Sequence, residues 1–151
     1  MKLLELGRGQ SVKGRYGWDY GSQLQAASAG GHVNIVQLLQ DRGADVNAQG
    51  GYYGHALQAA SAKGHEAIVR ILLDNNADVN AQGGPSGNAL QAASEQGDEA
   101  IVRILLDNNA DVNAQGGYYG NALQAASEEG YETIVRMLLD SGAIRSSIES
   151  S

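Results

Sequence analysis

One internal repeat constrains the fold of this chain more than any other feature. Residues 64–84 return 33 residues later, at residues 97–117, with a single change from His65 to Asp98. Two more diverged copies flank this pair. The four copies align on Leu24, Leu57, Leu90 and Leu123. A fixed period of this length indicates a stacked array, because one such unit cannot bury its own apolar face. We therefore predict a single elongated domain, an all-α repeat solenoid.

Within each unit, the apolar spacing predicts two short helices separated by a glycine. The second unit shows this pattern as two stripes on either side of Gly64. The first stripe comprises Ala56, Leu57 and Ala60, and the second comprises Ile68, Val69, Leu72 and Leu73. The second stripe has the spacing of one face of a helix. We expect Leu57, all four residues of the second stripe and their counterparts in the other units to be buried between neighbours.

Residues at the expected helix ends support these boundaries. Capping boxes are predicted at the start of the first helix in three copies, from Ser22 with Gln25, Asn88 with Gln91, and Asn121 with Gln124. In the second copy His55 occupies the same position and is a weaker cap. The second helix is expected to end at residues that tolerate the left-handed conformation, namely Gly43, Asn76, Asn109 and Gly142. The A-D-V-N-A-Q-G-G sequence that follows in three copies predicts a tight reversal with little strand.

Together these features resemble the ankyrin repeat family over residues 16–145. The slot where that family carries T-P-L-H reads S-Q-L-Q, H-A-L-Q, N-A-L-Q and N-A-L-Q, beginning at Ser22, His55, Asn88 and Asn121. Gly-His pairs between the helices, I-V-x-x-L-L in the second helix and G-A-D-V-N after it also match the family. The resemblance implies a turn plus two helices in each unit. The N-A-L-Q-A-A-S opening with A-Q-G-G turns is similar to the ankyrin arrays of fungal proteins, including NLR-like receptors.

The repeat pattern predicts three parts along the chain. Residues 1–15 are expected to form an N-terminal cap or the tail of a preceding repeat, residues 16–145 four ankyrin repeats, and residues 146–151 a polar C-terminal tail. The repeats are expected at approximately 16–49, 50–82, 83–115 and 116–145.

Composition indicates an intracellular protein. The chain contains no cysteine, which excludes disulfides and thiol chemistry. The apolar run at the start is too short for a signal peptide and is interrupted by Glu5. No segment has the apolar length needed to span a bilayer. We therefore expect no contact with a membrane and a cytoplasmic or nuclear location. We also expect a monomer, because no coiled-coil heptad or cysteine offers a route to self-association.

The charge is unevenly distributed. The formal net charge is −7, and residues 1–15 carry +3, so the remainder carries −10. Acidic residues concentrate on the third and fourth repeats, at Glu95, Asp98, Glu99, Glu128, Glu129 and Glu132. An acidic array repels phosphate backbones, so we expect no nucleic-acid partner. A basic protein segment is favoured, and the alternative is a solvated face that keeps the protein in solution.

The sequence predicts neither catalysis nor a metal site. The D-x-N-x-Q-G turns begin like a calcium loop, but alanine occupies the position of the closing glutamate at Ala56, Ala89 and Ala122. His32 and His65 occupy equivalent positions between helices, where a structural hydrogen bond is expected. Ser28, Ser61, Ser94 and Ser127 repeat with the unit and are expected to be architectural. Nothing resembles a nucleophile with its base and orienting group, so we predict no enzyme and no cofactor.

Recognition is expected at the positions that differ between copies, since the shared positions hold the stack together. In the ankyrin family, the turns and first helices line a concave groove where partners bind. The resemblance places these variable positions on that face: Trp18, Tyr52, Tyr118, Lys63, Glu95, Glu128 and Glu129. Tyr20, Tyr53 and Tyr119 are expected to pack on neighbouring turns instead. Pro85 and Ser86 interrupt the aromatic row and leave a gap for an inserted side chain.

Two functions fit these features. The first is a protein–protein interaction module that binds a protein or peptide on its concave face, as the recognition region of a larger fungal receptor-like protein. The alternative is a designed, consensus-like or trimmed ankyrin scaffold with no cognate ligand. Near-identical repeats fit both, because recent duplication and design leave the same signature.

Overall fold

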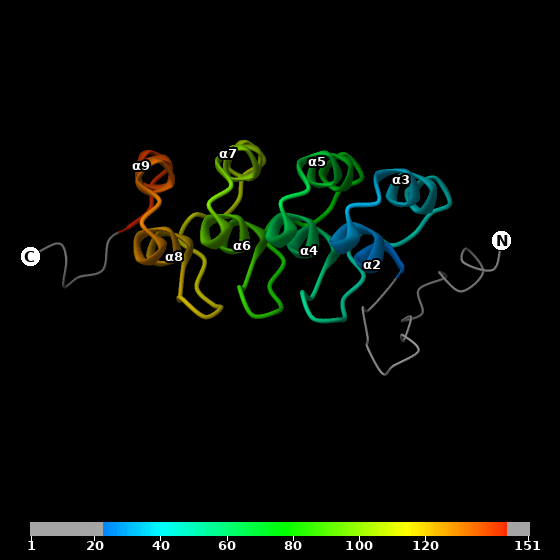
Figure 1. Ribbon diagram of the computed structural model, residues 1–151, viewed down its shortest axis with the longest axis horizontal. Coiled ribbons are helices and arrows are strands. Elements are labelled where there is room, and N and C mark those ends of the chain that lie inside the picture. The colour runs from blue at the N-terminus through cyan, green and yellow to red at the C-terminus, as the bar shows by residue number, and fades with distance from the viewer. Residues whose placement is uncertain (1–22, 145–151) are drawn as a thin grey trace, which may run out of the picture.

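The computed structural model describes residues 23–144, in which eight helices form two parallel rows (Figure 1). The first row comprises α2 (Gln23–Gly30), α4 (Ala56–Lys63), α6 (Ala89–Gln96) and α8 (Ala122–Glu129). The second row comprises α3 (Val33–Asp41), α5 (Glu66–Asp74), α7 (Glu99–Asp107) and α9 (Glu132–Asp140). The repeated helix pairs confirm the predicted all-α solenoid. The division into cap, repeats and tail stays a prediction, because residues 1–22 and 145–151 lie outside the described residues.

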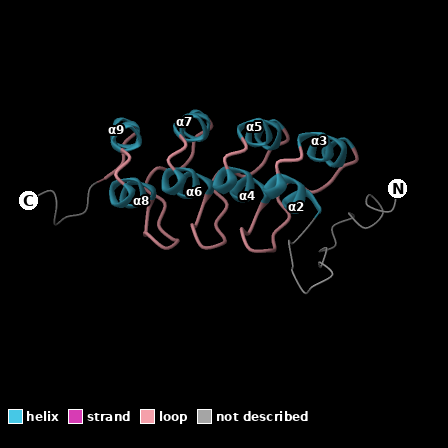
Figure 2. Cartoon of the chain, viewed as in Figure 1, coloured by secondary structure: helices cyan, strands magenta, loops and turns pink. Residues whose placement is uncertain are grey.

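A hairpin loop joins each helix pair to the next and extends below the first row of helices (Figure 2). Each hairpin contains one isolated antiparallel bridge, formed by Gly50 with Gly54, Gly83 with Gly87, and Gly116 with Gly120. The N–H group of the first glycine donates to the carbonyl of the second at 2.8–2.9 Å. The predicted tight reversal with little strand is therefore confirmed for these three turns.

The core lies between the two helix rows and between neighbouring repeats. Leu57, Ile68, Val69 and Leu72 are buried as expected, and Leu90 is fully buried in the next repeat. The prediction was wrong for Leu73, which is only partly buried at the edge of the core, as are its counterparts Leu106 and Leu139. It was also wrong for Val135, which is partly buried, and for Ile35, which is 38% exposed. At 100° per residue, Ile68 and Leu73 lie at the two edges of the α5 stripe, and only the edge at Ile68 is fully covered.

Most predicted helix ends are observed. The capping box of α6 is complete, since Asn88 Oδ1 accepts from the backbone N–H of Gln91 at 2.8 Å and Gln91 Oε1 accepts from that of Asn88 at 2.7 Å. Asn121 caps α8 in the same way, but Gln124 does not reciprocate. His55 makes no side-chain cap bond to α4, and Ser22 lies outside the described residues. Two residues after the last residue of each second helix, the chain has a positive φ, at Gly43, Asn76, Asn109 and Gly142.

Candidate protein-binding surface

A glutamine in each of the first three repeats ties its first helix to the following hairpin. Gln58 Nε2 donates to the carbonyls of Gly83 at 3.0 Å and Gly87 at 2.8 Å. Gln91 Nε2 donates to the carbonyl of Gly116 at 2.8 Å, and Gln25 Nε2 makes the equivalent bond to Gly54. This role was not predicted from the sequence. The sequence feature that could have indicated this role is the glutamine that all four copies carry where the ankyrin family usually has histidine.

The hairpins also stack directly on one another through their backbones. The N–H group of Tyr118 donates to the carbonyl of Pro85 at 2.9 Å. A Cβ atom on Gly84 would lie 2.6 Å from the carbonyl oxygen of Tyr53, and one on Gly117 would clash with the carbonyl of Ser86. Both glycines have φ near +70°, which favours glycine on its own account. The hairpin row is therefore a close-packed platform.

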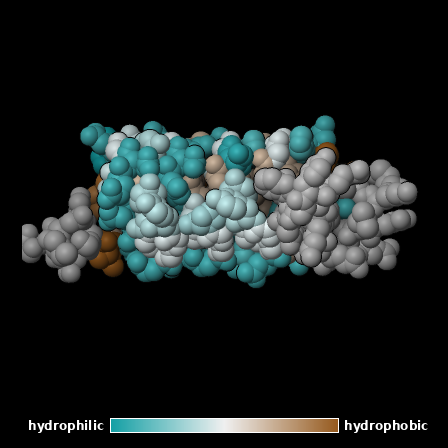
Figure 3. All heavy atoms as spheres, turned by 60° about the horizontal axis from the view of Figure 1, so that its bottom comes forward, coloured by the Kyte–Doolittle hydropathy of each residue, from teal (hydrophilic) through white to brown (hydrophobic). Residues whose placement is uncertain are grey.

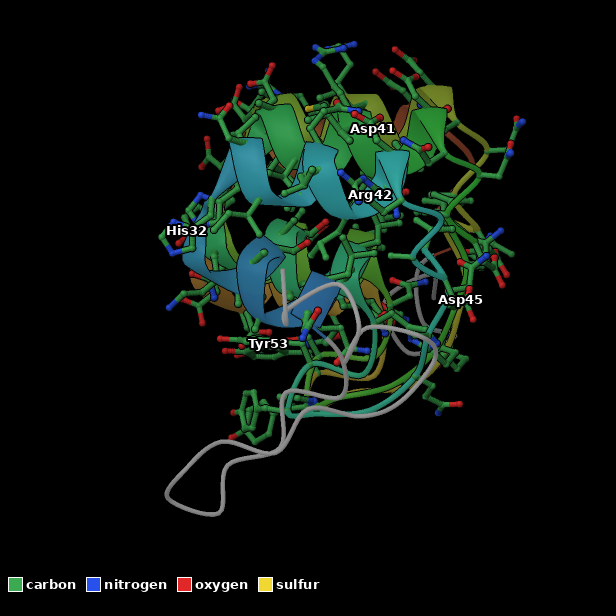
Figure 4. All side chains as sticks on the ribbon, turned by 90° about the vertical axis from the view of Figure 1, so that its right-hand side faces the viewer. His32, Asp41, Arg42, Asp45 and Tyr53 are labelled. Carbon is green, nitrogen blue, oxygen red and sulfur yellow. The ribbon has the colours of Figure 1, made fainter. Side chains whose placement is uncertain are left out.

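The two sides of the array are built differently. In Figure 4, Tyr53 lies on the same side as His32, which follows the end of α2, and Asp45 lies on the opposite side. On the Asp45 side, each turn binds the next through an asparagine: Asn47 Oδ1 accepts from the backbone N–H of Asp78 at 2.7 Å. Asn80 and Asn113 repeat this contact. Residues shared between the repeats thus occupy the Asp45 side.

Most of the predicted contact residues are accessible. Tyr52 is 67% exposed and Tyr118 is 83% exposed, while Tyr53 and Tyr119 are half-buried. Lys63, Glu128 and Glu129 are exposed and Glu95 is half-buried. Trp18 and Tyr20 lie outside the described residues. In Figure 3, which turns the hairpins toward the viewer, the hairpin row is a pale band of intermediate hydropathy among more polar side chains.

The tyrosines at the tips of the second and fourth repeats form right-angled pairs. The ring centroids of Tyr52 and Tyr53 lie 4.9 Å apart with an interplanar angle of 87°. Those of Tyr118 and Tyr119 lie 4.9 Å apart at 90°. This edge-to-face arrangement is a favourable geometry for aromatic pairs. Each pair therefore holds one half-buried and one exposed ring in a defined orientation.

In the third and fourth repeats, the hairpin tip is also bound to the end of the first helix. The Ser86 hydroxyl donates to Glu95 Oε2 at 2.7 Å, and the Tyr119 hydroxyl donates to Glu129 Oε2. The hydrogen bond to Glu129, together with the negative charges of Glu129 and Glu95, raises the pKa of Tyr119 to about 12. The phenol therefore stays protonated and keeps its bond throughout the neutral pH range.

The position between the two helices of each repeat has a different role in successive copies. His65 Nε2 lies 3.2 Å from the carbonyl oxygen of Ala29, which confirms its structural role. In the next repeat Asp98 caps α7, accepting from the backbone N–H of Ile101 at 3.0 Å. In the fourth repeat Tyr131 is half-buried and packs against the core. Ser28, Ser61 and Ser94 are fully buried, in keeping with the expected architectural role.

Two open grooves border these elements. One, of about 430 Å³, lies between the helix-joining loops of the second and third repeats and includes Lys63, Gln96 and Asp98 in its lining. The other, of about 690 Å³, lies on the second-helix row and is lined in part by Arg70, Arg103 and Asp107. The first groove continues the side that carries the tyrosines.

The turn aspartates are engaged with the backbone. The carboxylates of Asp45, Asp78 and Asp111 each accept from the N–H group two residues later, at 2.9–3.0 Å. Among residues 23–144, no three His, Asp or Glu side chains gather in a way that could hold a metal ion. No helix in that part of the chain is long and apolar enough to cross a membrane.

Comparison with known proteins agrees with this architecture. The family model described as ankyrin repeats (3 copies) matches residues 3–83 and 82–148. The chain therefore belongs to the ankyrin repeat family, whose members are in general non-enzymatic scaffolds for protein–protein interaction. A 28-residue stretch is 64% identical to "Azaphilone pigments biosynthesis cluster protein L" of the fungus Monascus ruber. That match covers 18% of this chain and 6% of the fungal protein, and it gives weak support to a fungal type of array.

Proposed function

We propose that the chain is a recognition module that binds a protein or peptide across its hairpin tips and the ends of its first helices. The observation that carries this proposal is the placement of the variable residues. The opposite side is occupied by the repeated asparagine contacts, whereas Tyr52 and Tyr118 are exposed at the tips. Exposed tyrosines supply contact area at little entropic cost and are enriched in interfaces.

The charge of this surface favours a basic partner. Glu128 and Glu129 are exposed at the end of α8, and Glu95 lies at the end of α6. Opposite charge across an interface contributes mainly to the rate and specificity of association. The same acidity disfavours a phosphate backbone. A basic protein segment, with no nucleic acid or membrane, is therefore the proposed partner of an intracellular, monomeric module within a larger fungal receptor-like protein.

The proposal is tested by selecting, from a random library, peptides that bind the full chain and then measuring the affinity of the selected peptides. Tyr52→Ala and Trp18→Ala should each weaken binding by at least about 1 kcal/mol if that residue is a hot spot. Arg70→Ala and Arg103→Ala, on the second-helix row, are the matched controls and should change affinity little.

If binding survives Tyr52→Ala and Trp18→Ala but is lost with Arg70→Ala or Arg103→Ala, the partner binds on the second-helix row. That result would contradict the proposal. Selection of no peptide, together with no protein retained from a fungal lysate, would favour a scaffold without a cognate ligand. Sedimentation at micromolar concentration tests the monomer, and a stable dimer would contradict it.

A further inference from the structure

Three successive hairpin tips have the same backbone but carry different chemistry. The second repeat combines the Tyr52–Tyr53 pair with Lys63 at the end of α4. The third repeat has Pro85 and Ser86 in place of the tyrosines, with Ser86 bound to Glu95. The fourth repeat combines the Tyr118–Tyr119 pair with carboxylates at the end of α8. Only this last tip, among those of the described residues, joins an aromatic pair to negative charge.

The geometry of the fourth tip is that of a two-walled corner. The rings of Tyr118 and Tyr119 meet edge to face at 90°, so the two ring planes form the walls of a corner. The hydrogen bond from Tyr119 to Glu129 holds one wall in place and brings a carboxylate to its edge. Tyr118, with 83% of its surface exposed, leaves the other wall open to a ligand. Glu128 adds a second exposed carboxylate at the same helix end.

We propose that this corner, formed by Tyr118, Tyr119 and Glu129, is a binding subsite for the ammonium group of a lysine side chain of the partner. A cation is attracted to the negative face of an aromatic ring, and the exposed ring of Tyr118 offers such a face to a ligand. The carboxylates add opposite charge at the same place. This inference rests on the proposed function, and it assigns one part of the surface to one chemical group.

The carboxylates favour lysine over arginine. One oxygen of Glu129 already accepts from Tyr119, and one oxygen of Glu128 accepts from Gln124 at 2.9 Å. Bidentate pairing with a guanidinium uses both oxygens of a carboxylate in a fixed plane. A compact ammonium has rotatable donors and needs only one oxygen from each carboxylate.

The second repeat provides the natural counterpart. Its tyrosine rings have nearly the same separation and angle, but Lys63 occupies the position that Glu129 has in the fourth repeat. A cationic ligand is repelled there, so the array presents two aromatic corners of opposite preference. A partner segment that crosses both is therefore bound in one direction, with its lysine at the fourth repeat.

The experiment uses the full chain with isotope-labelled tyrosine rings and follows their NMR signals. The probe is Nα-acetyl-lysine methylamide, and the control is the same compound acetylated on its Nε atom, which removes the charge. The charged probe should shift the Tyr118 and Tyr119 signals saturably, with an affinity at least about fivefold higher than at the Tyr52–Tyr53 corner. Equal shifts at both corners, or equal shifts with the uncharged control, would overturn the proposal.

Two exchange variants separate a cation subsite from general acidity. Glu129→Lys should weaken probe binding at the fourth tip by about tenfold, because it removes the attraction and adds repulsion. Lys63→Glu should create a new response to the probe at Tyr52 and Tyr53. Both positions are exposed, so circular dichroism should show an unchanged fold.

A Lys63→Glu variant with no new response would contradict the proposal, and so would tighter binding of the corresponding arginine probe. These outcomes are distinct from failure of the proposed function, which depends on whether selected peptides require Trp18 and Tyr52 and tolerate changes at Arg70 and Arg103.

Discussion

The interior repeats and the fourth repeat have nearly the same sequence but different surroundings. Val102 is fully buried, whereas its counterpart Val135 is only partly buried. Gln91 donates to the hairpin of the next repeat, whereas Gln124 donates to Glu128 of its own helix. Among the described residues, no further hairpin follows α9. How much a repeated residue contributes to stability therefore depends on the neighbouring repeat that covers it, as expected for a stacked array.

Serine shows the same contrast on a smaller scale. Ser94 is fully buried between first helices, while Ser127 is exposed at the same position of the fourth repeat. Four measurements, in order of decreasing expected effect, test this difference between interior and terminal units.

The largest effect is expected from Leu90→Ala. Leu90 is fully buried, so truncation should reduce the free energy of unfolding by about 2–5 kcal/mol through the cavity it leaves. Leu123→Ala, at the equivalent position of the fourth repeat, is the matched variant. Its loss should be smaller because Leu123 is 6% exposed and, among the described residues, no further first helix packs against α8. Urea denaturation measures both losses in the free energy of unfolding. A loss below about 0.5 kcal/mol for Leu90→Ala would mean that this face of the first helix is not the buried one.

Gln91→Ala should have the next largest effect. Its buried side chain both caps α6 through Asn88 and donates to Gly116, so its removal leaves buried polar groups without partners. We expect a loss of about 1–3 kcal/mol. Gln124→Ala, whose bond lies in solvent, should cost less than about 0.5 kcal/mol. Equal losses in urea denaturation would show that the inter-repeat bond adds no stability.

The ionisation of Tyr119 tests the contact between tip and helix in the fourth repeat. The bond to Glu129 raises the pKa of Tyr119 from 10.0 to about 12. Because the folded-state pKa is raised, the bond's stabilising effect is complete below pH 10 and is lost as the pH rises toward about 12. Glu129→Gln removes the charge and should lower this pKa toward 10. An NMR titration of the Tyr119 ring with no difference between the two proteins would contradict the contact.

Calcium should have no effect on any repeat. The turns that begin at Asp45, Asp78 and Asp111 all have the same side-chain-to-backbone bond. They also lack a closing glutamate twelve positions along. Neither a chelator nor calcium at constant ionic strength should move the melting temperature. A reproducible shift of several degrees would indicate a bound ion.

Much of the fold could be predicted because its signals are local. The spacing of Ile68, Val69 and Leu72 defines a helix face within two turns. The caps at Asn88 and the reversal at Asn109 depend on residues only a few positions away. The candidate surface was predictable to the extent that the repeat separates variable residues from shared ones, and Tyr52 and Tyr118 are indeed the exposed members of their pairs.

The contacts of the surface could not be predicted in the same way. Gln58 reaches carbonyl groups 25 and 29 residues farther along the chain, and Asn47 reaches an N–H group 31 residues away. Tyr119 was expected to pack on a neighbouring turn, and its hydrogen bond to Glu129 was not foreseen. The sequence contains the donors and acceptors, but not the angle at which the hairpin meets the first helix.

The sequence by itself determined the period, the two helices of each unit, their caps and the family, because each depends on local spacing or on the comparison of one copy with the next. Only the tertiary structure decided which of two equal residues is buried and which side of the array carries the asparagine contacts between turns. It also decided that the Tyr119 hydroxyl is bound to Glu129. The physical reason is that burial and hydrogen bonding are properties of pairs of segments, and the stacking of successive repeats is what brings those segments together.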